Sequence, residues 1–233
     1  MEGARVACLY TFGCPELRGN PEAEEAVLKF IREPNPENLP RIRTILEGLE
    51  PFVAYQIIAA ANGIEDPLSE EVVRAYWLGN DLLKIVTDDI LARVLSERFH
   101  SRDLLVAHKV RGRKPHHNLN VAWLVSIVQQ SVPQKLPHII SGASDCLVVP
   151  GRVIAGKEET IRVLASSIFV RGDQLLLVAT PRKVKRGFVE EINNGDLVSI
   201  HLDMAREVIR EETAESLMAV THESFQILQR GRV

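Results

Sequence analysis

The stretch DCLVVPGRVI, residues 145–154, decides the fold expected for the last third of the chain. It is rich in Val, Leu and Ile, which pack well on a pleated sheet, so residues 146–154 are predicted to form a strand. More short segments of this kind follow, separated by Gly-Lys, Gly-Asp and Asn-Gly-Asp turns, at residues 160–165, 167–170, 174–180 and 197–201. Short strands at this spacing predict a small, OB-like β-barrel.

The first half of the chain carries helix punctuation instead. Asn20 followed by Pro21 is typical of a helix start, and Pro34 cannot continue that helix. Residues 50–62 and 117–130 are predicted as further helices, the second being the longest apolar one.

These patterns define the expected organisation. A last helix is predicted over residues 204–228, and Ser141-Gly142-Ala143-Ser144 is predicted to be a short flexible linker. The fold class is therefore expected to be α+β. It comprises an all-α helical domain at residues 1–140, followed by a small barrel domain with a C-terminal helix at residues 145–233.

Composition narrows the classes of partner. The 233 residues are 45% hydrophobic, enough to bury a core, while a net charge of −3 and a pI near 6.2 provide no basic field. Neither nucleic acid nor a membrane surface is an expected partner. The chain shows no cationic leader and no apolar run of about 18 residues, and its three widely spaced cysteines suit a reducing compartment. A cytoplasmic location is predicted.

Two stretches of the C-terminal part resemble a known family. Residues 145–154 are similar to the opening Cys-Leu-x-x-Pro-Gly-x-Val strand of hydrogenase maturation chaperones of the HypC/HupF type. Residues 195–201, GDLVSIH, resemble the closing Gly-Asp-x-Val-x-x-His strand of that family, and an acidic helix follows them in both. The two motifs occur in the same order and at a similar separation.

The resemblance implies a site and a partner. In that family the cysteine is a ligand of the iron-dicyanide-carbonyl unit delivered to the large subunit of [NiFe]-hydrogenase, and it also contacts the client. The matching residue here is Cys146, and His201 matches the family's barrel histidine. Pro150 and Gly151 of the opening strand, and His201 of the closing strand, are expected to contact the partner together with Cys146. Cys146 follows Asp145 in the chain, so its nitrogen is acylated and cannot chelate a metal together with the thiol.

The whole chain also resembles a broader family whose genes tend to lie beside [NiFe]-hydrogenase genes and whose activity is not established. The matching pieces, besides the barrel motifs, are residues 12–15, 61–64, 66–68, 75–80, 115–117 and Val121. This resemblance implies a hydrogenase-associated role without specifying a reaction.

Three residues outside the barrel are further candidate metal ligands. Cys14 lies in a Gly-Cys-Pro turn, where its thiol is expected to project from a loop. His116 and His117 open the long apolar helix, and a neutral imidazole is the commonest protein ligand of transition metals. Adjacent helical residues point about 100° apart, so one histidine could instead pack or cap the helix.

Two other features have competing interpretations. Tyr76 and Trp77 lie near the end of a predicted helix, where aromatic residues most often belong to the core but can anchor a partner. The basic run at residues 111–114 suggests RNA binding, but only Phe169 and Phe188 lie in the barrel region, so no base-stacking platform is expected. A solvated loop is the preferred interpretation of that run.

The sequence as a whole predicts a non-catalytic accessory factor. It would bind the [NiFe]-hydrogenase large subunit or a maturation protein, and it could hold iron, as the Fe(CN)2CO unit, or nickel. The alternative is a metal-dependent enzyme with a Cys/His site between the two domains.

Overall fold

The structure is a computed structural model that describes residues 1–87, 89–90, 114–156, 159–172 and 174–230. The side chains of residues 227–230 are outside this description, as are residues 111–113 of the basic run. Residues 104–110, which the sequence pattern also predicts to be a short helix, lie outside the described residues as well. The chain divides into two compact units, Met1–His116 and His117–Val233. The helices of residues 117–146 thus belong to the same unit as the strands, which places the division earlier than the predicted domain boundary.

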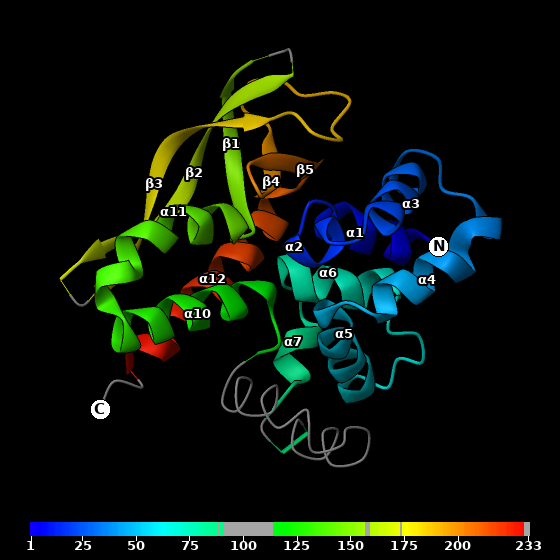
Figure 1. Ribbon diagram of the computed structural model, residues 1–233, viewed down its shortest axis with the longest axis horizontal. Coiled ribbons are helices and arrows are strands. Elements are labelled where there is room, and N and C mark those ends of the chain that lie inside the picture. Colours follow the sequence, from blue (N-terminus) through cyan, green and yellow to red (C-terminus); the bar gives the residue numbers. More distant parts are fainter. Residues whose placement is uncertain (88, 91–113, 157–158, 173, 231–233) are drawn as a thin grey trace. The chain divides into compact units, whose positions relative to one another are not determined.

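The described part of the N-terminal unit is helical. Its elements, labelled in Figure 1, are α1 (Glu2–Thr11), α2 (Pro15–Arg18), α3 (Pro21–Arg32), the 3-10 turn η1 (Pro36–Asn38), α4 (Leu39–Glu47), α5 (Glu50–Ala61), α6 (Glu70–Leu78) and α7 (Leu82–Ile85). The predicted start of α3 is confirmed, since the Asn20 side chain accepts a hydrogen bond from the amide of Ala23 at 3.2 Å. Helix α5 stops before Gly63, whose φ of 69° suits the residue after a helix end.

An aromatic cluster fills the core of this unit. The rings of Tyr10 and Trp77 stack with centroids 5.3 Å apart, and the indole N–H of Trp77 donates to the Tyr55 hydroxyl at 2.6 Å. Tyr76 and Trp77 are 2% and 0% exposed, so their assignment to a core is confirmed. Their rings pack against Tyr10 of α1 and Tyr55 of α5, and their alternative assignment as partner-binding residues stays a prediction.

The second unit combines helices with a five-stranded sheet. Its elements are α10 (His117–Ser131), the turn η3 (Pro133–Lys135), α11 (Leu136–Cys146), β1 (Val149–Ala155), β2 (Thr160–Arg171), β3 (Gln174–Lys185), β4 (Leu197–His201), β5 (Met204–Val208) and α12 (Glu211–Arg230). The α+β class is confirmed: helices precede the sheet, and helix α12 follows it (Figure 1).

The strands pair in the order β1-β2-β3-β5-β4, which closes the sheet. β1 lies antiparallel between β2 and β4, and β2 and β3 form a long antiparallel hairpin. The closure between β3 and β5 consists of one parallel pair, Lys185 with Met204. Helix α11 packs on β2 and helix α12 on β1, so the apolar interior of the sheet continues into a helical layer.

Three expectations about local structure are wrong. Residues 141–144 continue α11 rather than forming a linker, because Ala143 is buried and the Ser144 hydroxyl accepts a hydrogen bond from the amide of Ile168 on β2. Cys146 ends this helix instead of starting a strand. Residues 204–208 form β5 rather than the start of the last helix, because a tight turn at Leu202 and Asp203 returns the chain against β4.

Candidate metal centre

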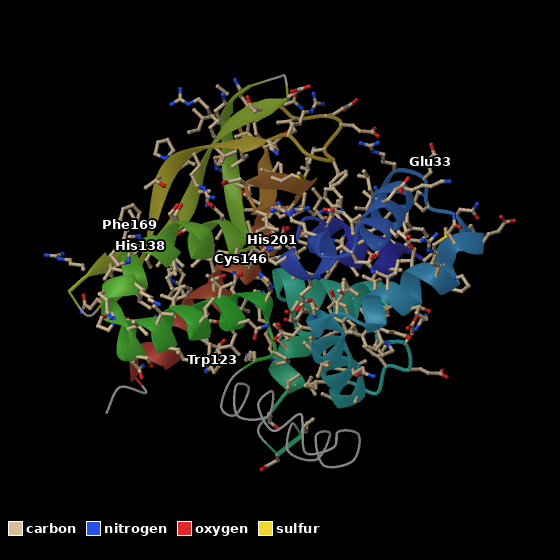
Figure 2. The ribbon with its side chains drawn as sticks, in the orientation of Figure 1. Glu33, Trp123, His138, Cys146, Phe169 and His201 are labelled. Atoms are coloured by element: carbon tan, nitrogen blue, oxygen red, sulfur yellow. The ribbon has the colours of Figure 1, made fainter. Side chains whose placement is uncertain are left out.

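Three side chains from separate elements of the second unit meet in one place. They are His117 at the start of α10, Cys146 at the end of α11 and His201 at the end of β4. Each offers one potential ligand atom, and these atoms lie within 4.8 Å of one another. Among the described residues, this is the group of at least three His, Cys, Asp or Glu side chains gathered closely enough to hold a metal ion. Figure 2 labels Cys146 and His201, which lie together where the strands meet the helices.

His117 links the other two members. Its Nε2 lies 2.8 Å from the carbonyl oxygen of Cys146 and 3.8 Å from the Cys146 Sγ. Since a carbonyl oxygen only accepts, Nε2 carries the proton in this arrangement. Metal ligation through Nδ1 would keep this bond, the usual second partner of a ligating imidazole, whereas ligation through Nε2 would replace it. The ring meets that of His201 edge to face, with centroids 4.9 Å apart.

His201 is fully buried and its backbone is held from two sides. The buried guanidinium of Arg206 donates to the His201 carbonyl oxygen, at 3.2 Å from Nε and 3.0 Å from a terminal nitrogen. The next two residues, Leu202 and Asp203, both have φ of 53°, as the central residues of a type I′ turn do. Leucine rarely adopts this backbone, and the amide of Leu202 is anchored to the carbonyl oxygen of Asp145 at 2.6 Å.

Asn118 positions the start of α10. Its amide nitrogen donates to the Val148 carbonyl and to the Thr221 hydroxyl, each at 2.7 Å, and its side-chain oxygen accepts from the Val148 amide at 2.8 Å. One fully buried side chain therefore ties α10 to the segment after Cys146 and to α12. His117, the preceding residue, is placed beside Cys146 as a result.

Cys146 is a protonated thiol in these surroundings. Burial and, to a smaller extent, the nearby carboxylate of Asp145 together raise its pKa to about 11. A thiol of this kind is a poor nucleophile at neutral pH, because the thiolate is the reactive form. A metal ion would have to displace the thiol proton to bind sulfur.

An ion-pair network stands beside the cluster. Arg182 donates to Asp145 at 2.9 Å and to Asp203 at 2.6 Å, joining the residue before Cys146 to the turn after His201. Burial raises the pKa of Asp145, and Asp203 raises it too, while Arg182 acts in the opposite direction. The network holds the two backbone segments that carry Cys146 and His201 close together.

The donor set fits a soft or borderline transition metal. One sulfur and two imidazole nitrogens suit zinc, copper, nickel or iron. Bonds of 2.0–2.3 Å in a tetrahedral site imply roughly 3.3–3.6 Å between donor atoms. The sulfur lies 3.8 Å from Nε2 of His117, near this value, although ligation through Nε2 would replace its bond to the Cys146 carbonyl. Closing the widest separation, 4.8 Å at most, requires an inward shift of roughly 1.2–1.5 Å. Three protein ligands would leave a fourth position open.

The predicted site residues fall into different surroundings. Cys14 and His116 belong to the N-terminal unit: Cys14 precedes α2, with its Sγ 3.8 Å from the Tyr10 carbonyl oxygen, and His116 is buried. Of the four predicted metal ligands, His117 and Cys146 lie in the cluster of the second unit.

Two of the predicted partner-contact residues have structural roles. His201, which was expected to contact the partner, is buried and belongs to the metal cluster. Gly151 is also buried, and a Cβ there would collide with Ile200 and approach Val163, so this glycine permits β1 to pack closely on its neighbours. Pro150 is half-buried on β1.

The sequence patterns did not predict His201 as a metal ligand. The signal that could have found it was the resemblance itself, which already pairs the opening-strand cysteine with the closing-strand histidine.

Comparison with known proteins identifies the family of this chain. The model of a family of unknown function, DUF6390, matches residues 19–232. The chain belongs to this family. No curated protein and no solved structure matches the sequence. Within the described part of the DUF6390 chain, none of the helices combines the length and apolar character needed to cross a membrane.

Proposed function

We propose that this protein is an accessory factor of [NiFe]-hydrogenase maturation or assembly that binds a transition metal at His117, Cys146 and His201. The observation that carries the proposal is the convergence of one thiol and two imidazoles, with donor atoms within 4.8 Å, in a single compact unit. The resemblance of the strands that flank this cluster to HypC/HupF chaperones supports the choice of metal and partner. Iron, as the Fe(CN)2CO unit, or nickel is the proposed cargo.

His117 and His201 can replace the amine ligand that the HypC/HupF family has beside its cysteine and that this chain lacks. Because Cys146 lies inside the chain, its nitrogen is acylated and the thiol lacks a neighbouring amine ligand. His117 and His201 supply nitrogen donors at the same place. A site of this composition binds soft or borderline metals through three protein ligands and presents the open position to a cargo ligand or to a client.

The proposed partner is the hydrogenase large subunit or a maturation protein. A metal carrier must bring its site to the surface of the recipient, and Cys146 is the partly exposed member of the cluster. The end of α11 and the adjoining start of β1, including half-buried Pro150, would then contact the partner.

Metal binding is tested with the purified full chain and Co(II), Ni(II), Fe(II) or Zn(II). We expect one equivalent of Co(II) to produce a thiolate-to-cobalt charge-transfer band. Cys146→Ser should abolish this band, and Cys14→Ser, which changes the half-buried cysteine of the other unit, should leave it intact. A band that survives Cys146→Ser, or none in the wild type, would contradict the metal assignment.

The partner is tested separately by affinity capture from a host that expresses [NiFe]-hydrogenase. Wild type and Cys14→Ala should retain a large subunit or a maturation protein, whereas Cys146→Ala should retain less. If the wild type retains neither class of protein, the hydrogenase assignment is contradicted. The metal site is tested independently by the cobalt spectrum.

One observation favours a metal-dependent enzyme as the alternative. Three protein ligands with an open position are also the pattern of catalytic zinc sites. An enzyme keeps its metal through turnover, whereas a maturation factor gives it up. Transfer of bound Ni(II) or Fe(II) to a metal-free large subunit therefore distinguishes the two roles.

A further inference from the structure

Strand β2 has an unpaired edge at its C-terminal end. β1 pairs with β2 from Arg162 to Ala165, whereas β3 pairs with the opposite edge as far as Arg171. In the described part of the second unit, no strand pairs with the first edge over residues 166–171. An exposed strand edge is a template for another strand, and proteins usually cover or blunt it.

One hydrogen bond shows which backbone amides of β2 face this edge. The amide of Ile168 points away from β3 and donates to the Ser144 hydroxyl on α11, at 3.0 Å. Residues two apart on a strand share this direction, so the amide of Val170 also faces the edge. Val170 is 40% exposed.

A groove of about 670 Å³ runs along this edge. One wall is the helical segment with Pro133, Leu136, Pro137 and Ile140, and the other is the strand with Ile168, Phe169 and Val170. The Phe169 side chain, on the strand side in Figure 2, is 45% exposed. Apolar walls beside a strand edge that no described strand covers at Val170 suit an extended chain better than a compact polar ligand.

The polar end of the groove carries an excess of negative charge. Asp145 and Arg182 line it, and Arg182 is paired with both Asp145 and Asp203. Two carboxylates against one guanidinium leave a net charge of about −1 when both are ionised. The side chain of Asp145 is 34% exposed, so a cation in the groove could reach it.

We infer that this groove binds an extended peptide segment of a partner protein, which adds to the edge of β2 as a further strand. The segment pairs with the outward backbone groups of β2 from the Ile168 carbonyl to Val170, beyond the Ile168 amide that Ser144 already binds. It places apolar side chains against Phe169 and Ile140 at alternate positions and carries a basic residue at the Asp145 end. Main-chain hydrogen bonds supply affinity in such strand addition, and the groove supplies specificity. The site lies beside the metal cluster but requires no metal.

β3 provides a matched control, because no described strand pairs with its outer edge before Lys185. The amide of Lys185 points to that outer side, where it donates to the Asp203 carbonyl. Ala179 shares this direction and is exposed, but it does not line the groove. Val170→Pro and Ala179→Pro thus each remove one outward amide, from the two different edges.

The test uses the metal-free full chain and acetylated, dye-labelled six-residue peptides of alternating Val and Thr with a terminal Lys. Fluorescence polarisation should show saturable binding. Val170→Pro should weaken it at least tenfold and Ala179→Pro less than twofold, with circular dichroism confirming that both variants fold. A Glu in place of the peptide's Lys should weaken binding, and Asp145→Asn should remove this difference.

Several results would overturn the inference: no saturable binding up to millimolar peptide, equal binding by Val170→Pro, or greater loss in Ala179→Pro. Saturable binding of an apolar dye that no peptide displaces would assign the groove to a small ligand instead. Because metal is absent throughout, these results are independent of the cobalt experiment on Cys146.

Discussion

The Cys8 and Cys146 thiols have different roles because their surroundings differ. Both thiols have a raised pKa, about 12 for Cys8 and about 11 for Cys146, and burial is the main cause in each. Cys8 lies fully buried in α1, where it acts as a small apolar residue. Cys146 is partly exposed and faces two imidazoles, so a metal that takes its proton finds further ligands.

The Cys8 thiol makes stability depend on pH in the alkaline range. Below pH 9 it is protonated in the folded and unfolded states alike and has no effect. Between pH 9 and about 12 only the unfolded state ionises, so the free energy of unfolding should fall by about 1.4 kcal/mol per pH unit. Cys8→Ala removes this contribution, so its stability deficit relative to wild type should shrink as pH rises.

Urea unfolding at pH 8 and pH 10 measures this difference. The two tryptophans are Trp77 and Trp123, one in each unit, so a Trp123→Phe background lets Trp77 fluorescence follow the N-terminal unit alone. Comparing the variant with the wild type cancels groups that titrate in this range independently of Cys8. Tyr55 cancels only in part, because its pKa is raised mainly by burial and also by the charge of Cys8. A deficit that is unchanged between the two pH values would contradict the predicted effect.

At the scale of elements, the second unit depends on polar contacts that join helices to strands. Asn118 joins α10 to the start of the sheet and to α12, Ser144 joins α11 to β2, and Arg182 joins β3 to the segments before Cys146 and after His201. Each of these residues fixes the orientation of a helix or segment relative to the sheet, which apolar packing alone would leave variable. The ligand cluster lies at the point where these contacts converge.

Asn118→Ala should lower the free energy of unfolding by about 2–4 kcal/mol. The substitution leaves the Val148 amide and carbonyl without their side-chain partner in a buried position. Metal affinity should fall as well, because His117 would lose its fixed position. Thermal unfolding and Co(II) titration measure the two effects.

Leu124→Ala is the control in the same helix. Leu124 is 52% exposed, so its truncation should change stability by only about 0.5 kcal/mol and leave the cobalt titration unchanged. Equal effects of the two substitutions would show that Asn118 has no special positioning role.

At the scale of the whole molecule, the candidate metal centre and the groove lie within the second unit. This unit has its own apolar core, made of residues from α10, α11, the sheet and α12. The three ligands and the residues that hold them are also contributed by this unit. Metal binding therefore requires no side chain from the N-terminal unit.

A fragment of residues 114–233 should fold and bind one metal ion with an affinity close to that of the full chain. The reason is that its core and its ligands are complete. Circular dichroism with thermal unfolding tests the fold, and cobalt titration tests the site. A folded fragment with a large loss of affinity would mean that the N-terminal unit contributes to the centre.

Local sequence determined the features that depend on neighbouring residues. Asn20 with Pro21 defines the start of α3, the apolar neighbours of Cys8 place it in a core, and the two barrel motifs mark β1 and β4. Only the tertiary structure decided the rest. Residues 141–144 and 204–208 take their structure from partners far along the chain, Ile168 and β4. His117 joins Cys146 and His201 because helix packing and the buried Asn118 side chain bring α10 to the sheet, a long-range effect that local sequence patterns do not encode.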